Sequence, residues 1–205
     1  RTDKKGFLPT MMEELYNERV TYKKKMLSAQ QEFENTKDNK YKKLISRYNN
    51  IQMARKISLN SAYGAIGNQY FRYYDKAIAE GITKSGQLSI RWIENRLNKY
   101  LNNILKTDED YVIASDTDSV YLTLDKLVTK TIKSDNALSK TINFLDKVAS
   151  ESIEPYITKS YDELKQYTNA FANKMFMKRE VIADKGIWVA KKRYILNVWD
   201  SEGVS

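Results

Sequence analysis

The first 66 residues carry two successive sets of apolar residues at helical spacing, and this pattern restricts the fold more than any other feature. Within each set, most members follow one another at steps of one, three, four or seven residues, as on one face of an α-helix. The first set is Leu8, Met11, Met12, Leu15, Tyr22 and Met26, and the second is Tyr41, Leu44, Ile45, Tyr48, Ile51 and Ile57. The polar residues 34–39 separate the two sets. We therefore expect two long helices joined by a short link, which is an antiparallel helical hairpin.

The middle of the chain combines a helical pattern with a strand-like one. Gly64 and Gly67 are expected to end the second helix. A third helix follows, and its apolar residues have the spacing of a helix that lies on a sheet. These residues are Ile90, Ile93, Leu97, Leu101 and Ile104. Residues 111–114 and 120–124 are rich in β-branched and aromatic side chains, which predicts a β-hairpin.

The last part of the chain again contains helices and then strands. A lysine-rich loop is expected beyond Asp125, followed by a fourth helix with the apolar set Leu138, Ile142, Leu145, Val148 and Ile153. Pro155 is expected to break or kink that helix, and residues 156–171 are helical again. Two strands are expected at residues 175–182 and 187–199, with a turn at residues 184–186. The predicted fold class is α+β, a long antiparallel helical hairpin followed by antiparallel strands packed on helices.

Positive charge is concentrated at the start of the sequence. The net charge is +9, and 14 Lys or Arg residues against 7 Asp or Glu residues lie between Arg1 and Lys56. This excess predicts a polyanionic partner, and it leaves open whether that partner is nucleic acid, acidic lipid or acidic protein.

The sequence contains neither Cys nor His. It therefore excludes disulfides, zinc-thiolate sites, a thiol nucleophile and a histidine general base. Any catalysis must depend on carboxylates, cations, hydroxyls and bound metal. No apolar run approaches the length of about 18 residues that a membrane span requires, and we expect a cytoplasmic protein with no membrane partner.

Two acids lie at the predicted tip of the β-hairpin, in the stretch Asp116-Thr117-Asp118-Ser119. Residues two apart in an extended strand face the same side, so both carboxylates would share one small volume if the backbone stays extended there. Like charges at such a distance need a cation or hydrogen-bond donors. Mg²⁺ fits, because it prefers hard oxygen ligands and substrate phosphates. The alternative is an ordinary polar turn.

The two predicted helices of the hairpin each carry a set of residues suited to a nucleotide. Arg19 and Lys23 are four residues apart and share a helix face. Lys56, Asn60 and Tyr63 share a face of the second helix, and Gly64 would let a ligand approach the backbone. The alternatives are a solvated cationic face for the first set and simple packing for the tyrosine.

Two ordered motifs connect these residues to a known family. Residues 56–64 fit the K-x-x-x-N-x-x-Y-G pattern of family B DNA polymerases, and residues 116–119 fit their D-T-D-S motif. The flanking residues 65–75, together with residues 175–180 and 191–200, resemble the replicative polymerases of T4-like bacteriophages in particular. The resemblance covers nearly the whole chain.

The resemblance implies a division into fingers, residues 1–66, and part of the palm, residues 67–205. It implies that Arg19, Lys23 and Lys56 hold the triphosphate of an incoming dNTP, and that Asn60, Tyr63 and Gly64 lie against the nascent base pair. It further implies that Asp118 binds two Mg²⁺ ions, or Mn²⁺, that Asp116 assists, and that Lys191, Lys192, Arg193 and Tyr194 track the primer-template DNA. Glu180 is expected near the active site.

The chain departs from the family pattern in two respects. The glycine that precedes the hairpin acids in the family is Ser115 here. The D-x-x-S-L-Y-P motif, which supplies another metal-binding Asp upstream of the fingers, has no match, and the exonuclease, amino-terminal and thumb regions are absent as well. We therefore expect a fragment or one part of a split polymerase, inactive without those segments, which would be its partners together with a sliding clamp. Its expected location is the cytoplasm of an infected bacterium if a phage encodes it.

Two alternatives remain from other functional classes. The chain can be a nucleic-acid- or nucleotide-binding module that performs no catalysis, or a structural fragment whose acids only form a turn.

Overall fold

The computed structural model describes residues 4–132 and 138–201. The chain divides into two compact units, with the boundary between Ile82 and Thr83. Helix α3 (Lys76–Leu105) begins in the first unit and continues in the second. The predicted α+β fold class is confirmed, whereas the functional division at residues 66 and 67 stays a prediction.

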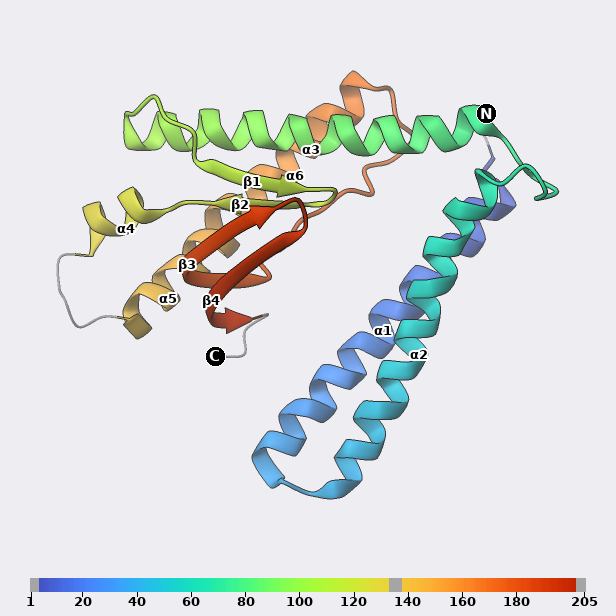
Figure 1. Cartoon of the computed structure of the whole chain (residues 1–205), viewed down its shortest axis with the longest axis horizontal. Coiled ribbons are helices and arrows are strands. Elements are labelled where there is room, and N and C mark those ends of the chain that lie inside the picture. The colour runs from blue at the N-terminus through green and yellow to red at the C-terminus, as the bar shows by residue number, and fades with distance from the viewer. Residues whose placement is uncertain (1–3, 133–137, 202–205) are drawn as a thin grey trace. The chain divides into compact units, whose positions relative to one another are not determined.

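The first unit is built on two antiparallel helices, α1 (Phe7–Thr36) and α2 (Asn39–Ile66), which run side by side in Figure 1. Lys37 has a left-handed backbone with φ of 53°, and its N–H bonds the carbonyl oxygen of Phe33 at 2.7 Å, which ends α1. Asp38 then caps α2 by accepting a hydrogen bond from the N–H of Lys40 at 2.9 Å. The predicted helical hairpin is therefore confirmed, and two residues make its reversal.

A narrow seam holds the two helices of the hairpin together. Ala29 is the buried residue that α1 contributes and Gln52 the one that α2 contributes. Tyr22 and Tyr48 meet across the seam with ring centroids 6.2 Å apart. Arg55 donates from Nε to Glu18 at 2.5 Å. The hairpin therefore depends on partly exposed side chains along its length.

Helix α2 runs through Gly64, contrary to the expectation that this glycine ends it. The C-cap is Gly67, whose N–H bonds the carbonyl oxygen of Tyr63 at 3.3 Å. A single glycine inside a helix costs about 1 kcal/mol and does not stop it when the following residues continue the pattern. The aromatic segment after Gly67 packs on itself and on α1, with ring centroids of Phe7 and Tyr73 5.1 Å apart.

The core of the second unit lies against one face of α3. Its buried residues include Ile93, Leu97, Leu101 and Leu105, which follow one another at steps of four. They pack against helix α6 (Glu154–Tyr167) and the hairpin strands β1 (Val112–Asp116) and β2 (Ser119–Leu122). The predicted apolar face is confirmed in this part. Ile104 is half exposed, because the repeat of four places Leu105 in the core instead.

The two sheets of the second unit are both antiparallel hairpins. Strands β3 (Val181–Ala190) and β4 (Arg193–Ser201) pair from Val181 and Ser201 to Ala190 and Arg193. The turn predicted at residues 184–186 is therefore wrong. Those residues remain in β3, where the register is irregular between Ile182 and Lys185, and the chain reverses at Lys191 and Lys192. Lys192 supplies the left-handed backbone of this turn, with φ of 62°.

The helices between the two sheets differ from the expected pattern in two places. A short helix, α4 (Asp125–Thr131), occupies the start of the expected lysine-rich loop, while residues 133–137 of that loop lie outside the described residues. Pro155 does not break the fourth helix. Helix α5 (Leu138–Val148) passes through the π-helical turn η1 (Ala149–Ile153) into α6, and Pro155 is the second residue of α6, directly after this wider turn.

Arg179 fastens the β3–β4 hairpin to helix α5. Its Nη2 bonds Asp146 of α5 at 2.5 Å, its Nη1 bonds Asp200 of β4, and its backbone N–H bonds the Glu154 carboxylate at 2.9 Å. The side chains of Arg179 and Asp200 are only 16% and 9% exposed. Burial opposes the charge of Arg179, but the hydrogen bonds to Asp146 and Asp200 outweigh it and raise the pKa of the guanidinium.

We expect Arg179→Met to lower the free energy of unfolding by about 3 kcal/mol, because it leaves the buried Asp200 carboxylate without this cation. Urea denaturation measures the change. Lys147→Met is the control, since the Lys147–Glu151 pair is 3.9 Å long and both side chains are mostly exposed, so its loss costs less than about 1 kcal/mol. Equal losses in the two variants would contradict the structural role of Arg179.

Candidate functional site

The tip of the β1–β2 hairpin presents the two acids on a tight turn. Asp116 is the last residue of β1 and pairs with Ser119, the first residue of β2. Thr117 has a φ of 55°, and the N–H of Asp118 bonds the carbonyl oxygen of Asp116 at 2.6 Å. The backbone is therefore not extended here, and the rule that residues two apart share a strand face does not apply. Asp116 instead ends β1, and Asp118 lies in the turn at which the chain reverses.

The surroundings of the two acids are unequal. Asp116 is partly buried and accepts a hydrogen bond from the Thr117 hydroxyl to Oδ1 at 3.0 Å. The Ser119 hydroxyl donates to the Asp116 carbonyl oxygen at 3.2 Å. Asp118 is exposed, and its carboxylate accepts no hydrogen bond from the residues that the structure describes. Asp118 is therefore the acid more open to an external ligand.

The donor set at the tip fits a divalent metal in its chemistry. Two carboxylates are the hard oxygen ligands that Mg²⁺ takes in proteins, typically together with substrate phosphates. Within residues 4–132 and 138–201 no group of three Asp, Glu, His or Cys side chains is arranged to hold a metal. Asp116 and Asp118 would therefore supply only part of a coordination shell.

Ser115 occupies its place without strain. It pairs with Val120 in the hairpin ladder and does not have a positive φ. The conformational freedom of a glycine is not needed at this position, so the departure from the family pattern leaves the hairpin intact.

Two asparagines of α3 fix the start of the acid-bearing hairpin, and the sequence analysis missed both. Asn98 Oδ1 accepts from the backbone N–H groups of Tyr111 and Val112 at 2.9 and 3.1 Å. Asn102 Oδ1 accepts from the N–H of Glu109 at 2.9 Å, and its Nδ2 donates to the carbonyl oxygen of Glu109 at 2.7 Å. The sequence signal that could have identified them is their spacing of four residues, which places both on one helix face beside the apolar face of α3.

The turn of the β3–β4 hairpin carries the predicted DNA-binding residues. Lys191, Lys192, Arg193 and Tyr194 are all exposed. The Tyr194 ring lies 5.4 Å from the ring of Tyr121 on β2, which brings this turn beside the strand that follows Asp118. The pKa of Tyr121 is raised, mainly by burial and also by its hydrogen bond with the Tyr194 hydroxyl. Glu180 is exposed and directly precedes β3.

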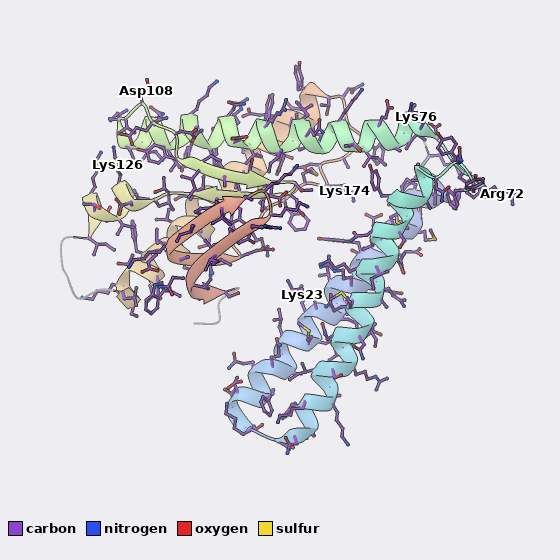
Figure 2. The ribbon with its side chains drawn as sticks, in the orientation of Figure 1. Lys23, Arg72, Lys76, Asp108, Lys126 and Lys174 are labelled. Carbon is purple, nitrogen blue, oxygen red and sulfur yellow. The ribbon has the colours of Figure 1, made fainter. Side chains whose placement is uncertain are left out.

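The predicted dNTP-binding residues lie on both helices of the first unit. Lys23, labelled in Figure 2, and Arg19 are partly buried on α1. The Nε of Arg19 is buried without a hydrogen-bond partner in the described part of the chain. The ion pair of Glu18 with Arg55 shows that Arg19 and Lys56 lie at the same level of the hairpin.

The α2 residues of this set are open to solvent. Lys56, Asn60, Tyr63 and Gly64 are all exposed, and a Cβ added to Gly64 would meet no atom within 4 Å. A shallow pocket of about 350 Å³ lies beside the Glu18–Arg55 ion pair, lined by Asn17, Glu18, Thr21, Tyr22, Lys25 and Arg55. It contains none of the predicted residues. None of the helices in the described ranges has the length and hydropathy needed to cross a membrane.

Comparison with known proteins establishes the class of this chain. The model for DNA polymerase family B matches residues 1–154. This match includes both motifs, the helical one on α2 and the D-T-D-S hairpin. The chain therefore belongs to DNA polymerase family B.

Several viral polymerases are similar to it. The DNA-directed DNA polymerase of Escherichia phage RB69 is 36% identical over 252 residues, covering 98% of this chain and 28% of that protein. The DNA-directed DNA polymerase of Enterobacteria phage T4 is 44% identical over 167 residues, covering 75% of this chain and 18% of that protein. A DNA polymerase beta of African swine fever virus is 28% identical over 74% of this chain. The resemblance to phage polymerases is confirmed, and the chain spans less than a third of each relative.

We expect Thr117→Gly to raise the free energy of unfolding by about 1 kcal/mol, because relief of the strain of a β-branched residue at positive φ outweighs loss of the exposed hydrogen bond from the Thr117 hydroxyl to Asp116. Urea denaturation measures the change. Ser115→Gly is the control two residues away in the ladder, where glycine brings only its entropic cost and lowers stability by about 0.5–1 kcal/mol. A loss of stability in Thr117→Gly would contradict the strain at the tip.

Proposed function

We propose that this chain provides the fingers, residues 1–66, and part of the palm, residues 67–205, of a template-directed DNA polymerase that adds dNTPs to a primer 3′-hydroxyl. The observation that carries the proposal is the exposed Asp118 at the turn of a D-T-D-S hairpin in a family B chain. Phosphoryl transfer requires positioning and charge neutralisation more than a protein base, which suits a chain without His or Cys.

Asp118 and Asp116 are the residues that would hold the metal, as two Mg²⁺ ions or Mn²⁺. Bound divalent metal would supply Lewis-acid activation of the primer hydroxyl and neutralisation of the leaving pyrophosphate. Asp118 is open to such a ligand, whereas Asp116 is partly committed to its hydrogen bond from Thr117. We therefore assign the principal ligand to Asp118 and the assisting one to Asp116, with further ligands from other polymerase segments such as the D-x-x-S-L-Y-P motif.

The helical hairpin would bind the incoming dNTP. Arg19, Lys23 and Lys56 would contact the triphosphate, since Arg19 and Lys56 lie at one level of the hairpin and all three are cations. Asn60 and Tyr63 would lie against the nascent base pair, and the open surface at Gly64 would permit a close approach. The unpaired Nε of Arg19 is consistent with a group that gains a partner on binding.

The β3–β4 turn would follow the primer-template duplex. Lys191 and Lys192 on the two-residue reversal and Arg193 at the start of β4 are exposed cations, which suits phosphate contacts that do not depend on base sequence. Tyr194 would act beside them, next to the acid-bearing hairpin. Exonuclease and thumb segments and a sliding clamp complete the proposed set of partners.

A second candidate is a module that binds nucleotide and nucleic acid without catalysis when this chain acts by itself. The absence of a third acid at the tip, within the residues that the structure describes, favours it. Binding of primer-template DNA by the 205-residue chain with no extension under Mg²⁺ would support this candidate, whereas extension would exclude it.

In a polymerase that contains this chain, Asp118→Ala should reduce the rate of primer extension by at least about a thousandfold, since the metal would lose its principal ligand. Extension of a labelled primer with Mg²⁺ measures the rate. Asp108→Ala is the control, because Asp108 is an exposed acid in the loop after α3 (Figure 2). Normal extension by Asp118→Ala would overturn the assignment.

Lys56→Ala should raise the KM for dNTP about tenfold or more while the Kd for primer-template DNA stays unchanged, because it removes one charge-assisted contact to the triphosphate. Steady-state kinetics with varied dNTP tests this. Lys24→Ala is the control, since Lys24 is an exposed cation of α1 that does not share the face of Arg19 and Lys23. A similar rise in KM for both variants would point to general charge rather than a specific site.

A further inference from the structure

Trp188 lies in a contact that joins the two hairpins of the second unit. It pairs with Tyr194 across β3 and β4, and the two rings stack with centroids 6.3 Å apart and planes 27° apart. The Tyr121 ring of β2 meets both of them edge-on, at 5.4 Å from Trp188 and 5.4 Å from Tyr194. Three rings therefore connect the hairpin that carries Asp118 to the hairpin that carries Lys191 and Lys192.

The backbone makes room for the Trp188 ring. Gly186 lies two residues before Trp188 on the same side of β3 and pairs with Leu196. A Cβ at Gly186 would lie 2.6 Å from Cη2 of Trp188 and 2.7 Å from Cδ2 of Leu196. The indole ring thus lies directly over the glycine backbone. This arrangement fixes the ring position more tightly than the exposure of Trp188 alone would suggest.

Short chain distances connect the three rings to the proposed binding groups. Tyr121 is three residues after Asp118, and Tyr194 is two residues after Lys192. Because each intervening stretch is a paired strand, displacement of either ring would displace the neighbouring turn. The rings therefore hold the acid-bearing turn and the cationic turn in a fixed relation within this unit.

We propose that Trp188 is a positioning residue that holds Tyr194 and the turn Lys191–Lys192 against the acid-bearing hairpin, so that duplex DNA bound at this turn is aligned with Asp118. The inference rests on the proposed function. Trp188 touches neither metal nor DNA in this role and acts through Tyr121 and Tyr194.

The test compares variants of the 205-residue chain by their Kd for a fluorescently labelled primer-template duplex. Trp188→Ala should raise this Kd about tenfold, because it removes two ring contacts. Trp188→Phe should retain most of the affinity, since phenylalanine keeps a flat ring over Gly186. Binding of dNTP should be unchanged in both variants, because the proposed dNTP residues lie in the other compact unit.

Trp199→Ala is the matched control. Trp199 lies on the same hairpin and is 39% exposed, against 36% for Trp188, and it has no ring contact with Tyr121. It should leave the Kd for the duplex unchanged. Equal weakening by Trp188→Ala and Trp199→Ala would overturn the proposal, as would wild-type affinity in Trp188→Ala.

Tyr121→Leu decides the outcome if Trp188→Ala fails to fold, which circular dichroism detects. This variant removes the β2 ring and leaves the Trp188–Tyr194 pair in place, so it should also raise the Kd about tenfold. Wild-type affinity in a folded Tyr121→Leu would overturn the positioning role. Failure of the wild-type chain itself to bind the duplex would instead overturn the proposed DNA-binding role of the β3–β4 turn, and the inference with it.

Discussion

Burial of one face of α3 is the interaction on which the second unit depends. Ile93, Leu97, Leu101 and Leu105 present a continuous apolar row to α6 and to the β1–β2 hairpin. The asparagines beside this row hold the entry to β1, so the same helix that organises the core also sets the position of the acids. The site is thus supported by regular elements, which hold side chains more accurately than loops do.

The first unit follows a different principle, because its two helices share a seam with little buried surface. Arg19 lies partly buried in this setting, and its Nε lacks a hydrogen bond in the described part of the chain. A buried donor without a partner costs stability, and such costs are concentrated at functional sites. The first unit is therefore held together by fewer buried residues than the second.

Much of the fold could be predicted from the sequence, because helices of this length repeat their apolar residues many times. The secondary-structure predictions were wrong where a short local sequence pattern suggested a turn or a break. The stretch Asp184-Lys185-Gly186 resembles a turn, but it lies within β3, where the strand register is irregular. The chain reverses instead at Lys191 and Lys192, although lysine is not a typical turn residue. For the site, the acids and their unequal roles could be named from the resemblance, but the unequal burial of the two carboxylates and the left-handed backbone of Thr117 follow from no sequence pattern. Asn98 and Trp188 depend on contacts between distant segments.

The regular pairing of the two long helices in the hairpin also has an evolutionary consequence. A hairpin of two helices closed by two residues can gain or lose whole turns at its closed end while the open end, with Lys56 and Asn60 nearer to it, keeps its geometry. Such an element tolerates length variation that a packed sheet would not.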